Sequence, residues 1–199
     1  MDSLKTELTL PYGWIALFWG SMFSGKTEEF VQLLNNAEKY GKLNVRAFKP
    51  KRDKRYGTDV ITSHLESKYP AYNVRDVKEI EKILKEKDQV KFVNLIGISE
   101  TQFLDDRIID FCLEQRQNGR KIILEGLVFD YKSNPFNFKN SEKTMCNLLA
   151  HVDYPIHKTA FCTDCGNPAI YTKRKTESKK QVLVGGEKEY KSNCYKCYE

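Results

Sequence analysis

The segment that most constrains this chain lies near its start and reads Gly20-Ser21-Met22-Phe23-Ser24-Gly25-Lys26-Thr27. It fits the phosphate-binding pattern of a glycine, four further residues and then Gly-Lys-Ser/Thr. A short apolar run, Trp14 to Phe18, precedes it, and a helical pattern from about Lys26 to Tyr40 follows it. This strand-loop-helix context predicts backbone N–H groups and a helix N-terminus that face a polyphosphate. Lys26 would add a charge, and Thr27 would offer a hydroxyl to Mg²⁺.

Short apolar segments alternate with helical patterns up to about residue 156. Further strands are predicted at Val45 to Phe48, where Pro50 would end the strand, at Phe92 to Ile98 and at Lys121 to Leu127. Further helices are predicted from about Val77, from Phe103 to Gln117 and from Ser141 to Leu149. Strands that are apolar on both faces indicate a mostly parallel sheet covered by helices. We therefore expect an α/β fold of the P-loop NTPase type, RecA-like, with helices on both faces of the sheet.

The length and charge of the chain limit its domain organisation and the classes of partner it can bind. The chain has 199 residues and a formal charge of +6, from 33 Lys plus Arg and 27 Asp plus Glu. This length suits one well-packed domain with a small appendage. The basic residues are scattered among acidic ones, so we expect no nucleic-acid partner. No apolar run approaches the roughly 18 to 20 residues that cross a bilayer, and we expect no membrane partner and a cytoplasmic location.

Six cysteines give a second strong pattern. Cys162 and Cys165 form one Cys-x-x-Cys pair, and Cys194 and Cys197 form another. Four thiolates suit tetrahedral Zn²⁺ and leave no position for water, so a structural zinc site is predicted, with a redox pair or an iron-sulfur cluster as the alternatives. From about His157 the periodic apolar pattern gives way to cysteine pairs, Thr, Lys and Gly. We therefore divide the chain into a P-loop α/β domain, 1–156, and a small zinc-binding module, 157–199.

The third predicted strand delivers a possible catalytic group. It ends just before Ser99 and Glu100, at the carboxyl edge of the sheet, where ligands of open α/β folds bind. Phosphoryl transfer needs positioning, charge neutralisation and a carboxylate that accepts the proton of the attacking hydroxyl. Glu100 is the candidate for that base, and a helix-capping glutamate is the alternative. The phosphate loop alone does not choose among hydrolysis, transfer and sensing.

Several separate motifs together resemble the thymidine kinases of the cytosolic type, also called type II. The resemblance covers about Gly13 to Tyr198. It rests on the phosphate loop, Lys49-Pro50, Asp53-Lys54-Arg55-Tyr56, Ser63-His64, Glu100-Thr101-Gln102-Phe103, Gly126-Leu127, Pro135-Phe136, Thr172-Lys173-Arg174, Gly185-Gly186 and Tyr190.

The resemblance implies transfer of the ATP γ-phosphate to the 5′-hydroxyl of thymidine or deoxyuridine, with Mg²⁺ as the charge bridge, for DNA precursor salvage. Position by position, it makes Glu100 the base and Arg55 a phosphate contact, and it adds Asp53, Ser99 and Gln102 to the phosphate loop as the ATP and metal site. The pyrimidine would pack on Phe103 and Tyr131, and its 5-methyl group would be surrounded by Met22, Leu127 and Thr172. The nucleoside would be bound through the backbone of Gln181, Val182, Leu183, Val184 and Gly185. Tyr190 would close over the sugar. A homotetramer inhibited by thymidine triphosphate is also implied.

Two positions depart from the family pattern. Ser99 stands where the family has an aspartate before the glutamate, and Val128 stands where it has an aspartate after Gly-Leu. Because a serine hydroxyl is a poor ligand for Mg²⁺, the ion would depend on Thr27, ATP phosphates, waters, and Asp53 or Glu125. Reduced activity is therefore expected. Two alternatives to a kinase stay open, a nucleic-acid-dependent P-loop ATPase and a nucleotide-binding regulator without catalysis.

Overall fold

A parallel sheet forms the centre of the molecule. The computed structural model describes residues 2–51, 59–63, 65–178, 181–183 and 185–199. The strand order is β5-β2-β6-β7-β1-β8, and every neighbouring pair is parallel. The strands are β1 (Trp14–Gly20), β2 (Val45–Pro50), β5 (Tyr72–Val74), β6 (Leu95–Ile98), β7 (Lys121–Gly126) and β8 (Tyr154–Lys158).

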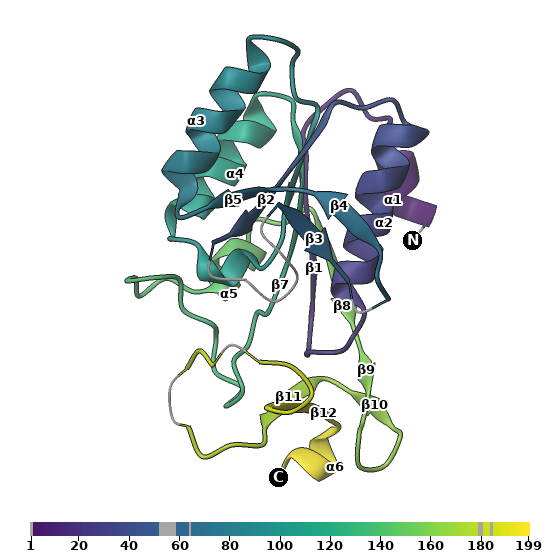
Figure 1. The fold of residues 1–199 in the computed structure, drawn as a ribbon, viewed down its shortest axis with the longest axis vertical. Coiled ribbons are helices and arrows are strands. Elements are labelled where there is room, and N and C mark those ends of the chain that lie inside the picture. Colours follow the sequence, from purple (N-terminus) through teal and green to yellow (C-terminus); the bar gives the residue numbers. More distant parts are fainter. Residues whose placement is uncertain (1, 52–58, 64, 179–180, 184) are drawn as a thin grey trace.

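Helices cover both faces of this sheet, as predicted (Figure 1). Helices α1 (Asp2–Glu7) and α2 (Lys26–Lys39) lie on one face, and α3 (Val77–Asp88), α4 (Arg107–Gln117) and α5 (Met145–Leu149) lie on the other. Alternate residues of β1 explain the two cores, because Ala16 and Phe18 pack with α2 while Ile15 and Leu17 pack with α3 and α4. The predicted fold class is confirmed. Among the described residues, no helix is long and apolar enough to span a membrane.

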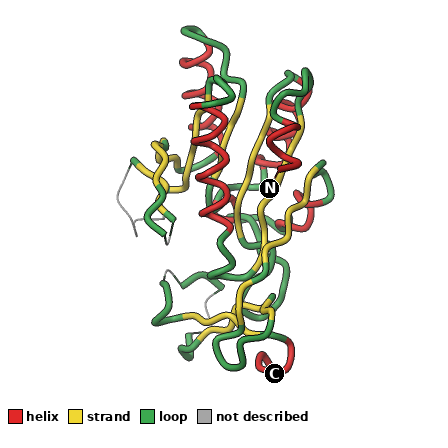
Figure 2. The backbone as a smooth tube through the Cα atoms, turned by 90° about the vertical axis from the view of Figure 1, so that its right-hand side faces the viewer, coloured by secondary structure: helices red, strands yellow, loops and turns green. Residues whose placement is uncertain are grey.

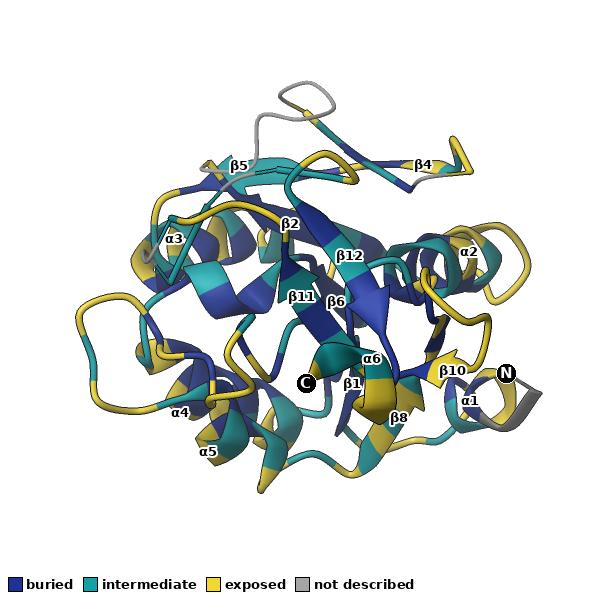
Figure 3. Cartoon of the chain, turned by 90° about the horizontal axis from the view of Figure 1, so that it is seen from below, coloured by how far each residue is buried: buried dark blue, intermediate teal, exposed yellow. Residues whose placement is uncertain are grey.

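The C-terminal segment lies beyond the carboxyl ends of the strands and away from the α/β layers (Figures 1 and 2). Viewed from below, β11, β12 and α6 lie in front of the central sheet (Figure 3). This module consists of two antiparallel pairs and a short helix: β9 (Ala160–Phe161) with β10 (Pro168–Ala169), β11 (Tyr171–Arg174) with β12 (Tyr190–Asn193), and α6 (Tyr195–Tyr198). Its position places it over the sheet edge where the phosphate loop lies.

Several predicted boundaries were wrong. Strand β2 continues through Pro50, which pairs with Val74, because parallel pairing continues through the N–H of Lys51, which donates to Val74 O at 2.9 Å. Helix α4 begins at Arg107 because a 3₁₀ turn, Thr101–Phe103, comes first. Helix α5 begins at Met145 rather than at Ser141, because Thr144 and Asn147 form a capping box.

The sequence patterns also missed several strands outside the C-terminal module. The polar segment before Pro70 contains an antiparallel hairpin of β3 (Val60–Thr62) and β4 (Lys68–Pro70), and β5 follows it. Strand β8 pairs with β1 and extends to Lys158, so the division between residues 156 and 157 falls inside a strand of the central sheet.

Candidate active site

The phosphate loop has the backbone that its glycines predict. Gly20 has φ 149°, and a Cβ atom there would lie 2.0 Å from Lys158 O, so only glycine fits. Gly25 has φ 75° and begins α2 in the left-handed conformation. Lys26 is buried, and its ammonium donates to Ser21 O at 2.8 Å. The loop is therefore folded around Lys26, at the N-terminus of α2.

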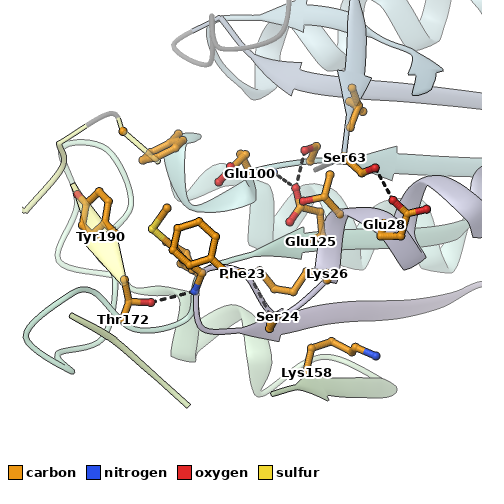
Figure 4. A pocket seen from close by; sticks show the side chains of 18 of the residues that line it. Phe23, Ser24, Lys26, Glu28, Ser63, Glu100, Glu125, Lys158, Thr172 and Tyr190 are labelled. Atoms are coloured by element: carbon orange, nitrogen blue, oxygen red, sulfur yellow. Dashed lines mark hydrogen bonds between the residues drawn. The ribbon is translucent and has the colours of Figure 1, made fainter. Parts of the chain in front are cut away.

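A cavity of about 710 Å³ lies between this loop, the ends of β6 and β7, the β3 hairpin and the C-terminal module (Figure 4). Most of the predicted site residues line it: Met22, Phe23, Ser24, Gly25, Lys26, Thr27, Ser99, Glu100, Phe103, Leu127, Tyr131, Thr172, Gln181, Val182, Leu183, Gly185 and Tyr190. Gly20, Ser21 and Gln102 are not among the lining residues. Asp53, Arg55 and Val184 lie outside the described residues.

Glu100 faces this cavity from the carboxyl end of β6. Its backbone is left-handed, with φ 50° and ψ 45°, and its side chain makes no capping hydrogen bond to the 3₁₀ turn that follows. Glu100 thus occupies the N-cap position of that turn, but its side chain does not cap it. Instead, Glu100 Oε2 accepts from Gln102 Nε2 at 2.5 Å, while Gln102 Oε1 accepts from the Leu127 N–H at 3.1 Å. A left-handed non-glycine residue costs free energy and often marks a functional site.

A second carboxylate, that of Glu125, lies beneath Glu100 at the end of β7. Its Oε1 accepts from Ser99 Oγ at 2.5 Å and from the Glu100 N–H at 3.0 Å. Burial and then the charge of Glu100 raise the pKa of Glu125 to about 7, while Lys26 acts in the opposite direction. The sequence had already offered Glu125 as a possible ligand of Mg²⁺, and its place near the carboxyl end of β7 agrees with that, since this edge of the sheet faces ligands.

The C-terminal module is bonded directly to the phosphate loop. The Met22 N–H donates to Thr172 Oγ1 at 3.0 Å, and Ser192 Oγ donates to Met22 O at 2.9 Å. Ser21 Oγ donates to Ala169 O at 3.3 Å. These contacts join the tip of the loop to β11, β12 and β10, so a ligand held between the module and β6 would lie next to the phosphate loop.

Arg174 organises the part of the module that faces the cavity, and the sequence reasoning gave it no role. Its guanidinium donates to Tyr190 Oη at 2.8 Å and to Gln181 O at 3.0 Å, and it stacks 3.6 Å from the centre of the Tyr131 ring. The hydroxyl of Tyr190 in turn donates to Leu183 O at 2.7 Å. No local sequence signal marks this role, because it depends on contact with Tyr131 from a distant segment.

The four paired cysteines converge, as predicted. Their sulfur atoms all lie within 4.8 Å of one another, and the Sγ atoms of Cys165 and Cys194 are 3.5 Å apart. Tetrahedral Zn²⁺ with Zn–S bonds near 2.3 Å would hold its sulfurs about 3.8 Å apart. Burial raises the pKa of Cys162, but hydrogen bonds from backbone N–H groups and from the Asn193 amide outweigh it and lower the pKa to about 5. The donor set and its spacing therefore fit a structural zinc ion.

A phosphate loop after the first strand of a parallel sheet and carboxylates at the ends of two neighbouring strands define a P-loop nucleotide-binding protein. The thymidine kinase family model matches residues 13–198. The thymidine kinase of Mycoplasma capricolum is 36% identical, covering 94% of this chain and 88% of that protein. Those of Mesoplasma florum and Mycoplasma mycoides are each 35% identical over 94% of this chain, covering 92% and 88% of those proteins.

The chain belongs to the thymidine kinase family, and the resemblance drawn from its motifs is confirmed. Membership makes it an enzyme that acts on a nucleoside. The nucleic-acid-dependent ATPase and the regulator without catalysis are not favoured by these relatives.

Proposed function

We propose that this protein transfers the γ-phosphate of ATP to the 5′-hydroxyl of thymidine, or of deoxyuridine, with the cavity described above as the site of both substrates. The observation that carries the proposal is the position of Glu100, which lines one cavity together with the phosphate loop and the C-terminal module. A hydroxyl bound under the module and a phosphate bound on the loop would therefore meet beside one carboxylate.

The phosphate end of the site would be held by the loop. Backbone N–H groups at the start of α2, with the Lys26 ammonium, would neutralise the β- and γ-phosphates. Arg55 and Asp53 remain proposed contacts to the phosphates and the metal. Oxygen donors suit Mg²⁺, and Thr27 and the carboxylates lining the cavity supply them. Mg²⁺, when bound with ATP, would neutralise the charge that develops on the transferred group.

Glu100 would accept the proton of the 5′-hydroxyl as that oxygen attacks phosphorus. Its position is fixed twice, by the left-handed backbone and by the hydrogen bond from Gln102. We therefore assign Gln102 a positioning role rather than a direct contact with ATP.

The nucleoside end would be built from both parts of the chain. Phe103 packs edge to face on Phe136 and, with Tyr131, offers aromatic surface for the pyrimidine. Met22, Leu127 and Thr172 would lie near the 5-methyl group, and Tyr190 near the sugar. Backbone groups of Gln181, Val182, Leu183, Val184 and Gly185 would read the base edge.

The remaining features come from the family resemblance. Zn²⁺ on the four cysteines would fix the segment after β8, residues 159–199, as a separate module. A homotetramer, feedback inhibition by thymidine triphosphate and a cytoplasmic location are expected as well.

The test is a nucleoside scan with zinc-loaded protein, ATP and Mg²⁺. Phosphate should pass to thymidine and deoxyuridine, and thymidine should raise the unfolding temperature while adenosine and uridine do not. Transfer to adenosine or uridine at the same rate, or no transfer to any pyrimidine deoxynucleoside, would contradict the proposal.

A further inference from the structure

Ser99 and Glu125 form a pair that the family pattern does not contain. In the register of the sheet, Ile98 lies opposite Leu124, so the next residues of the two strands, Ser99 and Glu125, lie side by side. Their side chains meet there, since Ser99 Oγ donates to Glu125 Oε1 at 2.5 Å. The chain therefore has a carboxylate next to the position where the family aspartate would be, but it projects from β7 instead of β6.

Strand alternation aims this carboxylate at the phosphate loop. Leu124 packs with α3 and α4, whereas Ile123 packs with α2, so Glu125 points toward the α2 face. Glu125 is paired with Phe18 of β1, which lies two residues before Gly20, where the phosphate loop begins. Figure 4 shows Glu125 between Glu100 and Lys26.

One oxygen of this carboxylate is left over. Oε1 accepts two hydrogen bonds, from Ser99 Oγ and from the Glu100 N–H, whereas Oε2 accepts none from the part of the chain that the structure describes. The side chain is 1% exposed, yet it lines the cavity. A carboxylate oxygen that opens to the cavity from an otherwise buried side chain is available to a cation there.

We propose that Glu125, oriented by Ser99, is the protein carboxylate that holds the Mg²⁺ of bound ATP, in place of a carboxylate at position 99. The inference rests on the proposed function of the same cavity. Mg²⁺ in such sites usually takes one or two carboxylates, with phosphates and waters completing its shell. Ser99 then acts as a positioning residue, because its hydroxyl occupies Oε1 and leaves Oε2 for the ion.

This arrangement also changes what Ser99 implies for the binding of Mg²⁺. A serine alone at position 99 predicts weak metal binding, but a serine that orients a neighbouring glutamate does not. It further separates the two glutamates by role. Glu100, held by the hydrogen bond from Gln102, is the proposed base, and Glu125 is the proposed metal ligand.

The test measures metal binding without turnover. Zinc-loaded protein saturated with the imido analogue of ATP is titrated with Mn²⁺, and free Mn²⁺ is followed by electron paramagnetic resonance. Glu125→Gln should weaken Mn²⁺ binding by about tenfold or more. Ser99→Ala removes the hydroxyl that occupies Oε1 and should weaken Mn²⁺ binding by a smaller factor, because Glu125 keeps its charge but loses its orientation. The double variant Ser99→Asp with Glu125→Gln should bind more tightly than Glu125→Gln alone, since it restores a carboxylate beside the same position and the glutamine amide can donate to it.

Glu86→Gln, at an exposed position of α3, is the matched control and should bind Mn²⁺ as the wild type does. Thermal unfolding and zinc content check that each variant is folded, and Glu125→Asp, which keeps the charge but shortens its reach, serves if Glu125→Gln is unstable. Unchanged Mn²⁺ binding in Glu125→Gln, or a double variant no tighter than Glu125→Gln, would overturn the assignment. Because no nucleoside is present, failure of thymidine phosphorylation would count against the proposed function and leave this result intact.

Discussion

The α/β core and the C-terminal module are stabilised in different ways. The core buries two large apolar clusters, one on each face of the sheet. The buried cluster of the module contains only Ala160, Cys162, Ala169 and Cys194 among the described residues. A cluster of two alanines and two cysteines buries little apolar surface, so we propose that a metal ion on the four cysteines supplies much of the order of the module. In our proposal the core carries the chemistry and part of the nucleoside site, and the module supplies the rest of that site, which allows the two contributions to be separated by experiment.

The largest effect should follow loss of the metal. Cys194→Ser removes one of four thiolates, and since structural zinc sites contribute roughly 10 kcal/mol or more, the module should unfold while the core stays folded. Thymidine phosphorylation and thymidine-dependent thermal stabilisation should both disappear. Limited proteolysis with mass spectrometry should show new cleavage confined to residues 159–199. Cys146→Ser, at a half-buried cysteine outside the cluster, is the control and should show neither change. Resistance of the module in Cys194→Ser would mean that the metal is dispensable.

Next in size is removal of the base from the core. Glu100→Gln keeps the shape of the side chain but cannot accept a proton, and general base catalysis typically contributes about 10² to 10⁴ in rate. We expect kcat to fall by that factor while the KM for thymidine and the binding of ATP stay nearly constant. Initial rates measured against thymidine concentration give kcat and KM, and calorimetry measures the binding of ATP. A rise in KM with kcat preserved would place Glu100 in binding instead.

Local patterns predicted most of the core. The apolar run before Gly20 and the helical period after Lys26 gave β1, the phosphate loop and α2 within a residue or two, because strand, loop and helix each have a strong local signal. The spacing of the cysteines likewise predicted the cluster. The family resemblance, rather than any periodicity, supplied Phe103, Tyr131 and Tyr190.

The missed parts depend on contacts between distant segments. The β3 hairpin and β8 were not predicted because most of their residues are polar, half-buried or exposed, Ile61 and Tyr69 excepted. Pairing with a partner strand decides their conformation. Glu125 gained its significance from Ser99 on another strand, and Arg174 gained its own from stacking on Tyr131, so neither role can be read from one segment alone.

A cavity in the core should cost stability without changing substrate recognition. Leu34 is fully buried on α2 and packs against the position of Gly97 on β6. Leu34→Ala should reduce the free energy of unfolding by about 2 to 5 kcal/mol, while KM for thymidine at a temperature well below the transition stays unchanged. Denaturant unfolding measures the first quantity and steady-state kinetics the second. Val90→Ala, at a side chain that is 87% exposed, should leave both near wild type. A large KM change in Leu34→Ala would show that the two regions are more tightly coupled than proposed.

The smallest effect should come from one hydroxyl in the module. Tyr190→Phe keeps the ring but removes the oxygen that donates to Leu183 O and accepts from Arg174. Because a hydrogen bond of this kind contributes about 1 kcal/mol net, the segment around Leu183 should loosen and KM for thymidine should rise severalfold, with kcat unchanged. Tyr40→Phe, at an exposed tyrosine of the core, should leave KM at its wild-type value. If Tyr190→Phe instead lowered kcat at constant KM, the module would take part in the chemistry. The proposed division of roles between the core and the module would then be wrong.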